Sequence, residues 1–297
     1  MATEDTHVDR VTGTATTGHE WDGIRELNTP LPRWWLWTLY LTIVWAMGYW
    51  VVYPAWPLVT SFTSGALGWS SRTAVVSELN DLKSLRAPMN TKLAATALGD
   101  IKTDQALADF TYAQGRASFR ENCGPCHGAG GGGAKGYPNL NDNDWLWGGS
   151  LEQIQHTIEF GIRSGHQKAR ESQMPAFGKD GMLKRDEIDN VASFVRSIAN
   201  LPTRSGANLA AGKTIYADNC AVCHGSDGKG NKEFGAPNLT DGIWLFGSEE
   251  AAIVEIVANS RNGVMPAWTG RLDPVTIKAL STGPSSRTNE IETRYPS

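Results

Sequence analysis

Four cysteines occur in this sequence, as two pairs with the same spacing, and a histidine follows each pair directly. The motifs read CGPCH at 123–127 and CAVCH at 220–224. Two thiols on one helical turn can each add to a porphyrin vinyl group, while the adjacent imidazole reaches the iron. The sequence therefore predicts two covalently bound c-type haems. The predicted thioether residues are Cys123, Cys126, Cys220 and Cys223, and the predicted axial histidines are His127 and His224.

Other uses of a Cys-x-x-Cys pair fit this sequence less well. A thioredoxin-like redox pair needs a βαβ context and no following histidine. A zinc site built from two cysteines and two histidines would need a His-x₃₋₅-His partner, which neither motif has. A disulfide closed within Cys-x-x-Cys is strained. Haem attachment is the preferred interpretation.

A methionine followed by Pro-Ala-aromatic lies downstream of each motif, at Met174 and Met265. A thioether on the far side of the ring would complete the iron coordination, raise the reduction potential and leave no open site. Methionine is also a common core residue, but equivalent positions before proline favour ligation. We expect Met174 to pair with His127 and Met265 with His224. A crosswise pairing is also compatible with two adjacent domains.

Two further histidines are alternative axial ligands. His156 falls on an expected helix, and the matching position later in the chain holds no histidine. His166 falls in a longer loop that precedes Met174. Both positions make ligation the less favoured interpretation.

The motifs belong to a tandem duplication of about 90 residues per copy. Each copy continues with a glycine-rich loop, a Pro-Asn-Leu segment, a tryptophan segment, a helical stretch and the methionine segment. We expect one domain at 106–201 and a second at 206–297, joined by the linker LPTRSG at 201–206.

Helices must position these segments. Residues 107–122 form an expected leading helix in the first copy, and Ile188, Val191 and Val195 line an expected closing helix. We expect Gly115 to let these two helices cross closely. In the second copy the closing pattern begins near 275 and ends at Gly-Pro, at about half the length.

The glycine run at 128–133 satisfies GxGxxG formally, but it follows a Cys-His pair and no strand. A backbone turn past the haem edge is the better interpretation. Trp145 and Trp244 are candidates for lining the haem or donating to a propionate, and ordinary core packing is an equal alternative.

An uncharged run of 20 residues at 34–53 is long enough to cross a bilayer as a helix. Tryptophan and tyrosine gather at its ends, as in interfacial belts. A buried core helix or a cleaved signal peptide fits less well, since 33 mostly polar residues precede the run. Arg25 and Arg33 on its N-terminal side predict a cytoplasmic tail at 1–33. An interfacial turn and a linker helix are expected within 54–105.

Composition excludes one further class. The net charge is −4, from 27 basic and 31 acidic residues, so the sequence has no basic excess that would indicate a nucleic-acid partner.

Taken together, these segments resemble the dihaem subunit III of cbb3-type cytochrome c oxidases. The residues that carry the resemblance are CGPCH at 123–127, GIRSGHQKARESQMPAFG at 161–178, CAVCHG at 220–225 and MPAW at 265–268. It covers about 34–274, and the short last helix departs from the family pattern.

The resemblance implies a mainly α fold, with one transmembrane helix and two tandem class I cytochrome c domains on the periplasmic side of a bacterial inner membrane. It implies a non-catalytic electron-transfer subunit. Electrons would pass from a donor cytochrome c to the monohaem subunit and the catalytic haem–copper subunit of the same complex. Alternatives are a free membrane-anchored dihaem carrier, a dihaem peroxidase with an open iron site, or an assembly module.

Overall fold

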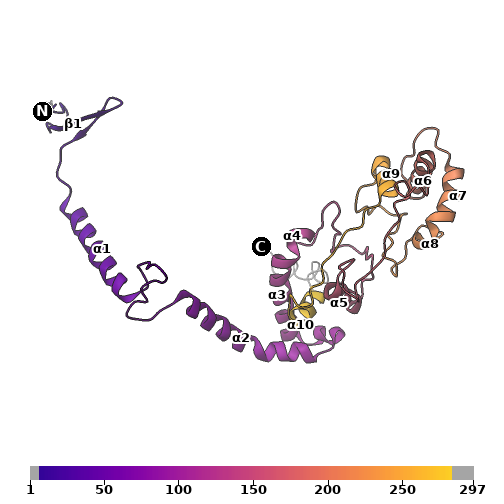
Figure 1. Cartoon of the computed structure of the whole chain (residues 1–297), viewed down its shortest axis with the longest axis horizontal. Coiled ribbons are helices and arrows are strands. Elements are labelled where there is room, and N and C mark those ends of the chain that lie inside the picture. Colours follow the sequence, from indigo (N-terminus) through magenta and orange to yellow (C-terminus); the bar gives the residue numbers. More distant parts are fainter. Residues whose placement is uncertain (1–6, 283–297) are drawn as a thin grey trace. The chain divides into compact units, whose positions relative to one another are not determined.

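The computed structural model describes residues 7–282, and its regular structure is mainly helical (Figure 1). The chain divides into two compact units, Met1–Leu85 and Arg86–Ser297. Residues 283–297, at the end of the expected second domain, lie outside the described residues.

The first unit begins with a short antiparallel hairpin that the sequence reading did not predict. Strand β1 (Thr16–Trp21) pairs with β2 (Ile24–Leu27) across a turn at Asp22 and Gly23. Both turn residues have positive φ, 50° and 84°. An Asp-Gly pair is a recognised signal for this kind of two-residue turn.

Helix α1 (Arg33–Val52) confirms the expected apolar helix. It is long and apolar enough to cross a membrane by length and composition, and none of its residues is buried within the unit. The following chain turns back on the end of α1, where Ala66 N–H donates to Val51 O at 2.8 Å. The ring centroids of Trp50 and Trp56 lie 4.9 Å apart there.

Helix α2 (Ser71–Ala95) lies within 54–105, where a linker helix was expected, and it ends within the second unit. Up to residue 282, the second unit continues with nine further helical elements. They are η1 (Leu98–Thr103), α3 (Gln105–Asn122), α4 (Gly124–His127), α5 (Leu151–Phe160), α6 (Arg185–Ile198), α7 (Leu209–Asn219), α8 (Ala221–His224), α9 (Glu250–Asn259) and α10 (Pro274–Ser281).

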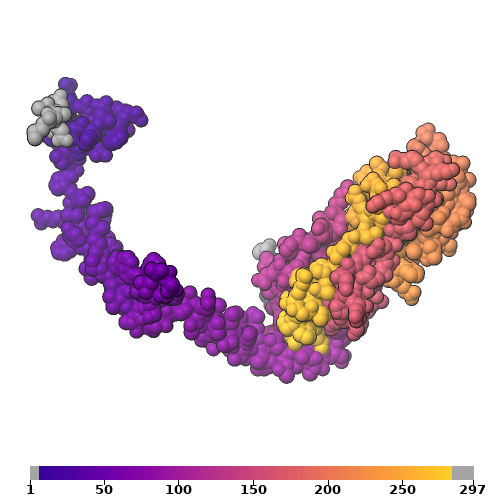
Figure 2. Space-filling view, viewed as in Figure 1, coloured from indigo at the N-terminus to yellow at the C-terminus, as the bar shows by residue number. Residues whose placement is uncertain are grey.

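Two hydrophobic cores hold this unit together, and each core draws on both sequence copies. One core combines the end of α2, η1 and α3 with α10, through Leu93, Ile101, Leu107 and Ala279. The other combines α6 of the first copy with α7 and α9 of the second, as Val191, Tyr216 and Val254 illustrate. Each closing helix therefore packs on the other copy. Figure 2 shows the C-terminal segment, in yellow, running from the orange second copy onto the magenta residues of the first.

The expectation that the first copy's leading and closing helices cross each other was wrong. Gly115 of α3 lies against α10, and a Cβ at Gly115 would come 2.7 Å from Ala279 O. Gly212 of α7 approaches α6 in the same way, since a Cβ there would come 2.8 Å from Phe194 Cβ. Both leading helices carry the same glycine notch, and each notch accepts the closing helix of the other copy. The last helix is short, as expected, with 8 residues in α10 against 14 in α6.

Candidate haem-binding sites

The two Cys-x-x-Cys-His motifs adopt the same backbone. In the first, Cys123 caps α3 and begins the single turn of α4, and His127 N–H donates to Cys123 O at 2.9 Å. In the second, His224 N–H donates to Cys220 O at the same distance. No disulfide joins any of the four cysteines. One tight turn thus carries two thiols and an imidazole, as covalent haem attachment requires.

A proline carbonyl fixes each motif histidine. His127 Nδ1 lies 3.1 Å from Pro138 O, and His224 Nδ1 lies 3.1 Å from Pro237 O. Because a carbonyl only accepts, Nδ1 must carry the proton, which leaves the Nε2 lone pair free for a metal. Sequence analysis missed this role, although the repeated Pro-Asn-Leu segments were its signal.

The loop after each motif depends on glycine. Gly133 has φ 72° and donates to His127 O at 2.7 Å, while a Cβ on it would come 2.6 Å from Tyr137 O. Gly230 repeats this arrangement, with a bond to His224 O at 2.7 Å. The glycine run turns directly after α4, with positive φ at Gly128, Gly131 and Gly133, and its passage past a haem edge stays a prediction. The donor set and the close-turning loops fit a c-type haem at each motif.

Met265 lies beside the first copy. Its backbone pairs with Ile162 in both directions, at 2.9 and 3.0 Å. Trp268 N–H then donates to Ile158 O in the last turn of α5 at 3.2 Å. Gly161 allows this close approach, since a Cβ there would come 2.8 Å from Ala267 N. The methionine segment of the second copy is therefore bound to the helix that follows the first motif.

Met174 lies beside the second copy. Its carbonyl accepts from Ser260 Oγ at 2.6 Å, and Phe177 N–H donates to Val257 O at 3.1 Å. The Met174 side chain packs against the core that contains Tyr216 and Cys220. These contacts place each methionine segment beside the other copy, as the crosswise alternative requires, and which haem each methionine ligates stays a prediction. No local sequence pattern distinguishes the two pairings, because both copies carry the same segments.

The alternative ligands His156 and His166 are engaged with Phe160 instead. Both rings lie 4.9 Å from the Phe160 ring, His156 edge-on and His166 stacked. His166 Nδ1 also accepts from Lys168 N–H at 3.0 Å. Burial, and then the charge of Arg170, lower the pKa of His156.

The two tryptophans at equivalent positions differ. Trp244 packs against the core around Tyr216, and its indole N–H donates to Asp241 O at 3.1 Å. Core packing is therefore the role that the structure gives Trp244, and its donor is already used. Trp145 covers Gly149, whose Cβ would come 2.7 Å from the indole Cδ1.

Burial dominates the electrostatics of the motif thiols. It raises the pKa of Cys123 to about 11, with a smaller contribution from Cys126. The pKa of Cys220 rises to about 11 for the same reason, with Cys223 adding to it. Before a haem is attached, these two thiols would therefore be protonated at neutral pH.

Family models match most of the chain. The model for subunit III of cbb3-type cytochrome c oxidase matches residues 110–195 and 207–282, once for each copy. The model for the N-terminal domain of cytochrome oxidase-cbb3, FixP, matches residues 13–60, which include the hairpin and α1.

Curated relatives match over nearly the full length. The cbb3-type cytochrome c oxidase subunit FixP of Bradyrhizobium diazoefficiens is 60% identical over 279 residues, which cover 94% of this chain and 96% of the relative. FixP of Azorhizobium caulinodans is 57% identical, covering 92% and 93%. Subunit CcoP of Azospirillum brasilense is 48% identical, covering 92% and 95%. The chain therefore belongs to the family of cbb3-type cytochrome c oxidase subunit III.

Proposed function

We propose that this protein is the electron-transfer subunit of a cbb3-type haem–copper oxidase. In this role it relays electrons from a donor cytochrome c through two c-type haems towards the monohaem and catalytic subunits. The family and its two cytochrome c domains support this role. So do the printed names of the relatives, which are oxidase subunits.

The observation that carries the proposal is the backbone bonding of the methionine segments. Met265 is held by Ile162, and Met174 by Ser260 and Asn262. Such fixed segments suit a ligand that stays in place through each redox cycle. A permanent thioether leaves no open iron site, which favours electron transfer over peroxidase chemistry.

Each side chain then has a defined task. The four motif cysteines form the thioether links, and His127 and His224 supply the imidazoles whose orientation Pro138 and Pro237 hold. We assign Met265 to the haem of His127 and Met174 to the haem of His224. When bound, each haem supplies a one-electron iron couple. In this scheme the domains at 106–201 and 206–297 exchange their methionine segments and closing helices.

The two motif loops also meet, which suits electron passage between the sites. Gly136 N–H, in the loop after the first motif, donates to Leu245 O of the second copy at 2.8 Å. Gly235 follows the second motif, and a Cβ there would come 2.8 Å from Trp147 Cδ2 of the first copy. Contacts in both directions fix one loop against the other.

Helix α1 anchors the chain in the membrane. We place residues 1–33 in the cytoplasm of a bacterial cell and the haem domains in the periplasm, on the arginines before α1. Protease added to intact spheroplasts should remove the haem domains and leave the tail. Removal of the tail from the outside would contradict this orientation.

Co-purification tests the function. After gentle solubilisation of native membranes, we expect this chain to be recovered with a haem–copper catalytic subunit and a monohaem cytochrome c subunit. Recovery of the chain alone would favour a free dihaem carrier. The reduced intact protein should also bind little carbon monoxide at its c-type haems. Strong binding at one haem would favour the peroxidase alternative.

A further inference from the structure

Arg170 occupies a fixed position beside the methionine that we assign to the first haem. Its N–H donates to Gly161 O at 3.0 Å, and its carbonyl accepts from Arg163 N–H at 2.8 Å. Ile162 lies between these residues and pairs on its other side with Met265. Ile162 therefore separates Arg170 from Met265, and its backbone pairs with both of them.

The side chain of Arg170 has no anion to neutralise it among the described residues. Its guanidinium lies over the Trp147 ring, 5.8 Å from the centroid. The Arg170 Nε atom is buried without a hydrogen-bond partner, and so is Nδ1 of His156. Within residues 7–282, no carboxylate forms an ion pair with Arg170. Arg170 is half-buried, and a buried N–H donor without a partner is unfavourable, so this position favours an acceptor such as an anionic group.

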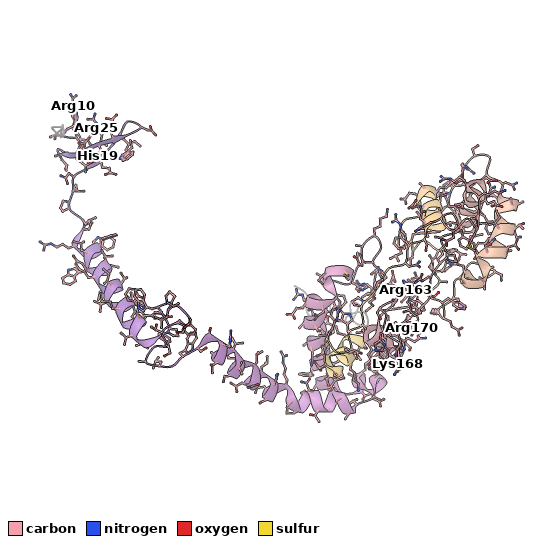
Figure 3. All side chains as sticks on the ribbon, viewed as in Figure 1. Arg10, His19, Arg25, Arg163, Lys168 and Arg170 are labelled. Carbon is pink, nitrogen blue, oxygen red and sulfur yellow. The ribbon has the colours of Figure 1, made fainter. Side chains whose placement is uncertain are left out.

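The neighbouring cations differ from Arg170. The Arg163 guanidinium is satisfied by two carbonyls, Gly263 O and Ser172 O, both at 2.7 Å. Lys168 is exposed and lies over the Phe160 ring, 5.3 Å from its centroid. Figure 3 labels these three residues, which all come from the segment after α5.

We propose that Arg170, with His156 beside it, binds a propionate carboxylate of the haem attached at Cys123 and Cys126. This inference rests on the haem sites of the proposed function. A haem propionate is the anion that this site would receive with its cofactor. The pairing with Ile162 and the contact with Trp147 both place Arg170 in the first copy, on the side where Met265 lies. Arg170 is a positioning residue, and its charge favours the reduced iron over the more positive oxidised iron.

Redox titration of the purified full-length protein, followed by absorbance, tests this proposal. Arg170→Gln should lower the midpoint potential of one haem and leave the other unchanged. Arg170→Lys keeps the charge and should restore part of the potential. Lys168→Gln removes an equal charge two positions away at the surface, and it should shift neither haem appreciably. His156→Phe removes the second polar partner and should lower the same potential by a smaller amount.

A Met265→His variant identifies the haem concerned. It replaces the thioether by a nitrogen ligand and lowers the potential of the haem that Met265 ligates. The haem whose midpoint potential falls in Arg170→Gln should be the same haem whose potential falls in Met265→His. The proposal would be overturned if Arg170→Gln shifted the midpoint potential of the other haem. It would also be overturned if the shift were no larger than the one caused by Lys168→Gln. In Arg170→Gln, the covalent haem content and the co-purification with the oxidase should be unchanged. A wild-type chain that lacked either property would contradict the proposed function itself, independently of the role of Arg170.

Discussion

Gly115 of α3 faces the backbone carbonyl of Ala279 in α10, so the leading helix of the first sequence copy is closed by the last helix of the second. Further bonds join α10 to α3 and to the end of α2. Gln114 Nε2 donates to Thr276 Oγ1 at 3.1 Å, and Lys278 Nζ donates to Ala94 O at 3.0 Å. The exchange of closing helices therefore has both an apolar and a polar basis.

Gly115→Ala tests this crossing. Alanine is the better helix former, yet its Cβ would meet the Ala279 carbonyl. We expect a loss of about 1–3 kcal/mol in the free energy of unfolding, as for other overpacked sites. Gly99→Ala is the control, because nothing lies within 4 Å of a Cβ there. Urea titration of both variants measures the difference, and equal stabilities would contradict the close crossing.

Crosswise ligation predicts a specific pattern of carbon monoxide binding. Met265→Ala should open one haem per chain to the gas, as should His127→Ala. Because both residues ligate the same iron in our assignment, the double variant Met265→Ala/His127→Ala should still show about one reactive haem. Combining Met265→Ala with His224→Ala should show about two. The opposite pattern would establish within-domain pairing.

Asp273 should stabilise α10 through its N-cap. Its carboxylate accepts from Val275 N–H at 3.1 Å and Thr276 N–H at 3.0 Å. Asp273→Ala should cost about 1 kcal/mol of stability, whereas Asp273→Asn, which can still cap, should cost less. Thermal unfolding measured at the first haem should report the loss, since α10 packs on α3. A loss seen only at the second haem would contradict the exchange.

The same aspartate gives an acid dependence. Burial raises the pKa of Asp273, but the hydrogen bonds from Thr276 and Val275 outweigh burial and hold the pKa below its ordinary value of 3.8. The unfolded chain thus binds a proton more readily. The stabilisation is complete above 3.8 and disappears as the pH falls through the folded-state pKa. Acid unfolding curves of the wild type and Asp273→Asn should converge at low pH.

Asp144 should make stability depend on pH in the opposite direction to Asp273. Burial, followed by the charges of Asp241 and Asp142, raises its pKa above 3.8. The folded state then holds the proton more tightly, so stability falls as the pH rises from 3.8 through the folded-state pKa. Asp144→Asn should raise the urea midpoint at pH 7 and have a smaller effect at acidic pH. The exposed Asp218, changed to Asn, is the control. A lower midpoint for Asp144→Asn at pH 7 would contradict this account.

Chemistry-bearing segments could be predicted from the sequence because their signals are local. The Cys-x-x-Cys-His motifs and the apolar run at 34–53 need no knowledge of long-range packing. The hairpin could also have been predicted from the sequence, because Asp22 and Gly23 form a typical two-residue turn. The sequence could not predict which closing helix packs on which leading helix. Gly115 and Gly212 are equivalent positions, and either one allows a closing helix to approach closely. The role proposed for Arg170 could not be predicted either, because only the three-dimensional structure shows that its Nε atom is buried without a hydrogen-bond partner.

The exchange of closing segments also sets an order on biosynthesis. The first copy packs with the Met265 segment and α10, which come from the end of the described chain. This packing cannot be complete while the chain is still emerging from N- to C-terminus. Folding of the first domain is thereby coupled to synthesis of the second copy, and a chain truncated before 274 would leave α3 without α10.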